Sequence, residues 1–287
     1  MDSVTIRVPA TTANLGPGYD ALGIALRIYN HVTVRRAEAA SPHPMASEAA
    51  AEFFPASGAA QFPFDWSITG EVPRSRGLGS SVTVRLGLLH GLNELTGRPL
   101  TPQRLFELCA RLEGHPDNAA PAAFGGFTVA GGPQVARFPV APELTFVLLI
   151  PDFEIATPES RKVLPPQIER LSAARSCANA CRITAAFASQ NYELLHGAFH
   201  DFLHQPYRER ALIPFLSTAI AAGERAGALG GFLSGSGSTI CCVAEEKADG
   251  GGRRAREIGE AMLAASECAG ARIVITTADN EGTCVVK

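Results

Sequence analysis

The residues with the clearest chemical potential form the run Gly77-Leu78-Gly79-Ser80-Ser81. An apolar repeat from Val82 to Leu95, at spacings of three and four residues, predicts that a helix follows directly. The N-terminus of a helix carries free N–H groups and about half a positive charge, and glycines let phosphates approach the backbone. The run therefore predicts a phosphate-binding loop in which Ser80 or Ser81 can offer a hydroxyl to Mg²⁺. The alternative is a glycine turn with a serine cap.

A second polar run, Glu113-Gly114-His115-Pro116-Asp117-Asn118, follows a predicted helix end. So many polar groups beside a glycine and a proline are costly to bury unless they are hydrogen-bonded or bind a ligand. Glu113 offers the hard oxygen that Mg²⁺ prefers, and Asp117 could orient a hydroxyl nucleophile or accept its proton. The alternative is a helix C-terminus followed by a polar turn.

The lysines restrict how phosphate is held. The chain has only Lys162, Lys247 and Lys287, and none follows a glycine. The G-x-x-x-x-G-K-[ST] phosphate loop is therefore excluded, and any phosphate site must work without its lysine.

Two further segments carry weaker signals. The turn from Thr12 to Asp20 contains Asn14 and Asp20, an amide and a carboxylate that could capture an ammonium group, although both are ordinary turn residues. The glycine- and serine-rich segment 234–239 allows close backbone approach to a ligand, although a linker or hairpin turn is equally consistent with it.

Strands and helices are mixed without strict β-α alternation, so the predicted class is α+β. A boundary near Pro151 divides the chain into domains 1–153 and 154–287. Strands are predicted at 4–8, 31–35, 64–68, 144–150, near 232, at 240–243 and at 272–276. Helices are predicted at 47–54, 82–95, 102–113, 167–187, 192–200, 215–226 and 253–269.

Composition excludes several classes of protein. With 46% hydrophobic and 18% charged residues the chain can bury a core, and a net charge of −3 lacks the basic excess of nucleic-acid or membrane-surface binders. No apolar run approaches the roughly 20 residues that span a bilayer, and no basic stretch followed by an apolar block opens the sequence. A cytoplasmic protein without nucleic-acid or membrane partners is therefore expected. The seven cysteines, an odd number, are expected to be reduced thiols.

Together, and in this order, these segments resemble the GHMP kinase superfamily and, within it, the homoserine kinase family. The resemblance covers nearly the whole chain: residues 9–20 are similar to the first motif, 73–81 to the phosphate loop and 234–239 to the third motif. The segment 113–121 favours homoserine kinases over mevalonate or galactose kinases. The fold implied is an N-terminal domain like ribosomal protein S5 domain 2 and a ferredoxin-like C-terminal domain, with the site between them.

The resemblance implies ATP-dependent phosphorylation of the L-homoserine hydroxyl to O-phospho-L-homoserine, a step of threonine biosynthesis, with Mg²⁺. The implied ATP-binding residues are Pro73, Arg76, Gly77, Leu78, Gly79, Ser80 and Ser81, and the implied metal ligands are Ser81 (or Ser80) and Glu113. The implied substrate-binding residues are Asn14, Asp20, Asn118, Arg161 and Arg208, with Arg210 as the alternative to Arg208 as carboxylate clamp. The implied catalytic residues are Asp117, Asn118, Thr157 and Arg161.

Several points stay open at the level of the sequence. Asp117 is either a base or an orienting group, and His115 is interpreted either as structural or as a group that supports a neighbouring site residue. Another small hydroxylated metabolite as substrate, or a non-catalytic sensor with this fold, are the alternative functions. A homodimer is allowed for, because the sequence does not determine the assembly state.

Overall fold

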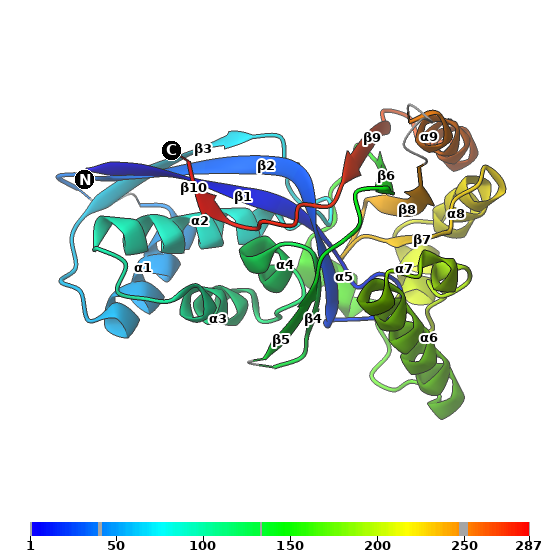
Figure 1. Ribbon diagram of the computed structural model, residues 1–287, viewed down its shortest axis with the longest axis horizontal. Helices are drawn as coiled ribbons and strands as arrows, with labels where there is room; N and C mark the ends of the chain where they lie inside the picture. Colours follow the sequence, from blue (N-terminus) through cyan, green and yellow to red (C-terminus); the bar gives the residue numbers. More distant parts are fainter. Residues whose placement is uncertain (1, 40–41, 133, 247–251, 287) are drawn as a thin grey trace.

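Two antiparallel sheets with helices packed against them form the framework of the protein (Figure 1). The structure, a computed structural model, describes residues 2–39, 42–132, 134–246 and 252–286. The first sheet has the order β10-β1-β2-β4-β5, and β3 also pairs with β2. Its strands are β1 (Ser3–Ala13), β2 (Leu22–Arg36), β3 (Phe64–Gly70), β4 (Phe127–Ala130), β5 (Val135–Phe138) and β10 (Cys284–Val285).

Four helices cover one face of the first sheet, namely α1 (Pro44–Ser57), α2 (Ser80–Leu95), α3 (Pro102–Glu113) and α4 (Ala119–Phe124) (Figure 1). The apolar stripe predicted for α2 is confirmed, since Leu86, Leu89 and Leu92 are fully buried in a core shared with Ile6 and Val8 of β1. Packing of this stripe fixes the direction of α2, and with it the position of its N-terminus.

The second sheet has the strand order β7-β8-β6-β9. Its strands are β6 (Leu144–Ile150), β7 (Gly230–Leu233), β8 (Ile240–Glu245) and β9 (Arg272–Thr277), and α8 (Leu216–Arg225) and α9 (Arg253–Ser266) pack together against it. Along the chain, β6, α8, β7, β8, α9 and β9 form the β-α-β-β-α-β succession of a ferredoxin-like fold. The predicted α+β class is confirmed.

Three helices and one 3-10 turn connect β6 with α8: α5 (Thr157–Lys162), α6 (Arg170–Ser189), η1 (Tyr192–Leu195) and α7 (Gln205–Ala211). The helix predicted at 192–200 is wrong, because only the turn at 192–195 forms there. Gly197 adopts a φ of 68°, a left-handed conformation that ends any right-handed helix.

The domain boundary at residue 153 stays a prediction, and the strand pairing adds two facts to it. β6 lies before this boundary yet pairs with β8 and β9 in the second sheet. β10 lies after it yet pairs with β1, with Ile6 opposite Val285. The chain therefore crosses between the two sheets more than once.

Two smaller expectations concern cysteines and membranes. All seven cysteines are free thiols, as predicted. Within the described residues, no helix is both long enough and apolar enough to cross a membrane.

Candidate active site

A cleft of about 620 Å³ brings together residues from all four segments that the sequence singled out. It lies where the start of α2, the end of α3, the turn after β1, and residues from α5 and α7 meet. The predicted site residues that line it are Asn14, Asp20, Gly77, Gly79, Ser80, Ser81, Glu113, Asp117, Asn118, Thr157, Arg161 and Arg208. The predicted residues that do not line it are Pro73, Arg76 and Leu78.

Within the phosphate loop, Gly79 is the N-cap residue of α2 and has a φ of 68°. Among the described residues, no side chain caps this helix start, so its first N–H groups stay available to an anion. A Cβ on Gly79 would lie 2.1 Å from Oγ1 of Thr11, and a Cβ on Gly77 would lie 2.1 Å from the carbonyl oxygen of Ser234. Both glycines are therefore required by close packing as well as by their backbone conformation.

The three loop residues outside the cleft have other partners. The Arg76 side chain donates to the carbonyl oxygen of Pro151 at 2.9 Å and lies near the carboxylates of Asp152 and Glu154. Leu78 is buried in the apolar core, and Pro73 lines a different cavity. The structure thus offers backbone and serine groups for phosphate, and it does not bring these three side chains to the cleft.

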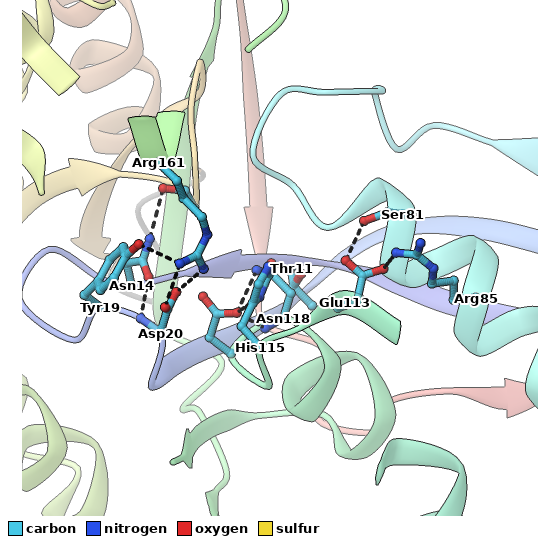
Figure 2. A network of polar contacts seen from close by, with 12 residues as sticks. Thr11, Asn14, Tyr19, Asp20, Ser81, Arg85, Glu113, His115, Asn118 and Arg161 are labelled. Atoms are coloured by element: carbon cyan, nitrogen blue, oxygen red, sulfur yellow. Dashed lines mark hydrogen bonds and ion pairs between the residues drawn. The ribbon is translucent and has the colours of Figure 1, made fainter. Parts of the chain in front are cut away.

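Ser81 and Glu113 form a pair at one end of the cleft (Figure 2). The Ser81 hydroxyl donates to Oε2 of Glu113 at 2.8 Å, and the Glu113 side chain is 6% exposed. A hydroxyl and a carboxylate are hard oxygen donors, so this pair fits Mg²⁺. Arg85, one turn after Ser81 on α2, donates through Nη1 to Oε1 of Glu113 at 2.6 Å.

Asp117 and Asn118 occupy the middle of the cleft. Oδ1 of Asp117 accepts hydrogen bonds from the backbone and side-chain amides of Asn118 and lies 2.6 Å from Nδ1 of His115. The hydrogen bond to Asp117 raises the pKa of His115 above its ordinary value, although burial opposes the shift. Thr11 donates its hydroxyl to Oδ1 of Asn118 at 2.7 Å, which fixes the amide orientation. Oδ2 of Asp117 takes no hydrogen bond from the described part of the chain.

An ion pair stands at the other end of the cleft (Figure 2). Arg161 donates to both carboxylate oxygens of Asp20, at 2.7 and 3.1 Å, and to the hydroxyl of Tyr19 at 2.9 Å. Asn14 fixes the Asp20 backbone, because its Oδ1 accepts from the Asp20 N–H, and its Nδ2 donates to the carbonyl oxygen of Gly235. Two residues predicted to bind substrate are therefore paired with each other, and a third holds the turn.

Arg208 is a buried cation beside this ion pair, with 2% of its surface exposed. Its guanidinium donates to the carbonyl oxygens of Gly235 at 2.9 Å and Ser160 at 3.2 Å, and to Nδ1 of His204 at 3.1 Å. Burial lowers the pKa of Arg208 from its ordinary value. Arg210, the alternative carboxylate clamp, is exposed and does not line the cleft.

A second cavity, of about 350 Å³, adjoins the phosphate loop and shares Ser75, Ser80 and Ser81 with the cleft. Its apolar and aromatic lining includes Trp66 and His43, whose rings meet edge to face at 5.2 Å. Asn30 and Arg74 also line it, so the cavity is a mixed polar and apolar space with an aromatic wall, next to the start of α2.

Comparison with known proteins identifies the family. The family models described as "GHMP kinases N terminal domain" and "GHMP kinases C terminal" match residues 45–126 and 183–262, respectively. A homoserine kinase of Clostridium beijerinckii is 39% identical over 260 residues, which cover 85% of this chain and 87% of that protein. One of Trichormus variabilis is 37% identical over 295 residues, covering 96% and 95%. The chain belongs to the homoserine kinase family of the GHMP kinases.

Solved structures support the same family assignment. A crystal structure of homoserine kinase from Cytophaga hutchinsonii matches with a TM-score of 0.89 and 25% identity, covering 100% of this chain and 98% of that one. A mevalonate kinase structure matches with a TM-score of 0.70 and 15% identity, which shows a common fold only. The predicted domain types of the GHMP kinase fold are confirmed.

For this member of the homoserine kinase family, the sequence did not reveal the contacts of Arg85 and His204, whereas the contact of His115 with Asp117 agrees with its interpretation as a structural or supporting group. Arg85 follows Ser81 by four residues on a predicted helix, and this spacing puts both on one face. The spacing could therefore have placed Arg85 beside Ser81 and its predicted partner Glu113. His204 precedes Arg208 by four residues, but α7 was not predicted, so that signal was hidden. The contact of His115 with Asp117 gave no spacing signal, because both lie in an irregular turn.

Proposed function

We propose that this protein transfers the γ-phosphoryl group of ATP to the side-chain hydroxyl of L-homoserine, giving O-phospho-L-homoserine. One observation carries the proposal: a single cleft has the start of α2 beside the Ser81–Glu113 pair at one end and the Asp20–Arg161 ion pair at the other (Figure 2). Asn118 lies between the two ends. A phosphate donor and a small zwitterionic acceptor can therefore meet inside one site.

The nucleotide binds across the two adjoining cavities. Its triphosphate lies on the N–H groups at the start of α2, and its base enters the cavity that Trp66 lines. Ser80 and Ser81 border both cavities, so they stand where the phosphates join the nucleoside.

Ser81 and Glu113 would hold Mg²⁺. When bound, this ion would neutralise charge that develops on the phosphates during transfer. The apolar stripe of α2 and the end of α3 keep the hydroxyl and the carboxylate in register for this role.

The acceptor binds by its two charges. Arg208 offers its positive charge and Nη2 of its guanidinium for the α-carboxylate, because Nε and Nη1 already donate to Ser160, Gly235 and His204. One carboxylate oxygen of Asp20 and one of Asp117 lie within 4.8 Å of each other, and these two negative groups would hold the α-ammonium group. Binding of substrate then replaces part of the Asp20–Arg161 ion pair and releases Arg161 toward the reacting groups.

Phosphoryl transfer depends mainly on alignment and on charge stabilisation. The amide of Asn118, oriented by Thr11, holds the acceptor hydroxyl, and the free oxygen Oδ2 of Asp117 accepts its proton or orients it. Arg161 and Thr157 stand at the reacting end of the acceptor, where the arginine stabilises the transferring group.

A coupled assay of ADP release tests the proposal. Turnover of ATP should require L-homoserine, and L-serine and mevalonate should give little or none. Equal turnover with either of these, or none with L-homoserine, would reject the proposed acceptor. An Asn118→Ala variant is the matched control, since it should keep ATP binding while losing acceptor-dependent turnover.

A further inference from the structure

The Glu113 carboxylate already forms an ion pair with a cationic side chain of the same protein. Arg85 donates through Nη1 to Oε1 of Glu113 at 2.6 Å and through Nη2 to Oε2 of Glu48 at 2.9 Å (Figure 2 shows the contact with Glu113). Its side chain is only 16% exposed and lines the cleft. Arg85 thus bridges carboxylates of α1 and α3 beside the place where the proposed metal binds.

A guanidinium does not give up its proton, so Arg85 remains charged whatever else binds to Glu113. A divalent ion on the same carboxylate would lie next to this positive charge and be repelled by it. The repulsion is only weakly screened, because the Glu113 side chain is 6% exposed. Glu113 is therefore a poor ligand for a metal ion that arrives alone.

The contacts of Arg85 also leave it with an unused hydrogen-bond donor that could bind an anion. Its Nε is buried and has no hydrogen-bond partner in the described part of the chain. An arginine with an unused donor at the edge of a phosphate site can shift part of its bonding toward a phosphate group. Triphosphate would then offset the positive charge that a bare metal ion would meet.

We propose that Arg85 is the resident counter-ion of Glu113 and makes metal binding there conditional on the nucleotide. It is a positioning residue that acts through Glu113. The bare divalent ion is rejected, whereas the metal–triphosphate complex supplies the negative charge that balances Arg85. This inference rests on the proposed function, because it takes Ser81 and Glu113 as the metal ligands.

The test is a titration of the nucleotide-free protein with Mn²⁺ at pH 8, with free Mn²⁺ measured by electron paramagnetic resonance. Arg85→Met keeps the apolar stem and removes the charge, and it should tighten Mn²⁺ binding by about tenfold or more. The matched control is Arg111→Met. Arg111 lies on α3, the helix that carries Glu113, and its positive charge forms a more exposed pair with Glu52 of α1. The control should change Mn²⁺ affinity less than about threefold, because its pair is solvent-screened.

Two further arms make the result specific. The double variant Arg85→Met/Glu113→Gln should lose the added affinity, since the gained site is Glu113 itself. A repeat with ATP present should show that the enhancement of Mn²⁺ affinity by nucleotide is about tenfold smaller in Arg85→Met than in the unmodified protein.

Unchanged or weaker Mn²⁺ binding in Arg85→Met would overturn the proposal, as would an equal gain in Arg111→Met. If thermal unfolding shows that Arg85→Met does not fold, Arg85→Gln gives the same comparison. The Mn²⁺ titrations use no L-homoserine, so a wrong acceptor assignment would appear in the turnover assay while leaving these results intact.

Discussion

Replacing Arg208 by lysine tests the end of the cleft that is proposed to bind the amino-acid carboxylate. Lysine keeps the positive charge but loses the planar fork, and loss of one charge-assisted hydrogen bond costs about 1.5–3 kcal/mol. This predicts a rise in the KM for L-homoserine of about tenfold to a hundredfold, with a smaller change in kcat and none in the KM for ATP. The variant also removes buried hydrogen bonds to Gly235, His204 and Ser160, so the free energy of unfolding should fall by about 1–3 kcal/mol.

Steady-state kinetics and inhibition by 3-amino-1-propanol separate the two effects. This analogue keeps the hydroxyl and the amine of homoserine but has no carboxylate. If Arg208 binds the carboxylate, Arg208→Lys should leave the inhibition constant of the analogue unchanged while weakening homoserine binding. Arg210→Lys, on the same helix but exposed, should behave like the unmodified enzyme. The reasoning fails if Arg210→Lys raises the KM and Arg208→Lys does not, or if both ligands weaken equally.

Three other perturbations have expected outcomes. Glu113→Gln should raise the Mg²⁺ concentration for half-maximal activity by more than about tenfold, which a magnesium titration measures; an unchanged requirement would place the metal elsewhere. Gly77→Ala should lower the free energy of unfolding, measured in urea, by about 1–3 kcal/mol more than Gly97→Ala does. Both glycines have a positive φ, but a Cβ on Gly77 would meet a carbonyl oxygen, whereas nothing lies within 4 Å of a Cβ on Gly97. Burial lowers the pKa values of His90 and His204 to about 4, from about 6.5 when unfolded, so the unfolded chain binds more protons between these values. Stability should therefore fall as the pH drops from 6.5 to 4, by up to about 1.4 kcal/mol per pH unit for each histidine, and His90→Leu should show a shallower slope than the unmodified protein.

Local patterns predicted the elements that carry the phosphate loop. The stripe from Val82 to Leu95 has the helical period, and α2 spans Ser80–Leu95. α3 was also predictable, since Thr101 caps it and Pro102 stands at its first position. The missed elements are short, such as β4 at Phe127–Ala130 and α7 at Gln205–Ala211, and their formation depends on packing partners distant in sequence.

The choice of charge partners could not be predicted, because these partners are brought together by the tertiary fold. Asp20 and Arg161 are 141 residues apart in sequence and pair directly. Arg76 stands inside the phosphate-loop motif, yet its side chain turns to the carbonyl oxygen of Pro151. Residue type and motif position predicted which charges approach the cleft, but the directions of their side chains follow from neighbours that the sequence does not place.

Three of the seven non-glycine residues with a positive φ in the described part of the chain line the cleft. Asn14, Asp20 and Ser75 all line it and have φ values of 70°, 57° and 50°. A left-handed conformation costs such residues roughly 1 kcal/mol each, so other contacts must hold them in place. Each of the three is tied to the C-terminal half of the chain: Asn14 donates to Gly235, Asp20 accepts from Arg161, and the carbonyl of Ser75 accepts from the N–H of Ile155. These three contacts join the two halves of the chain, so they hold the strained residues in place at the same time as they position both sides of the cleft.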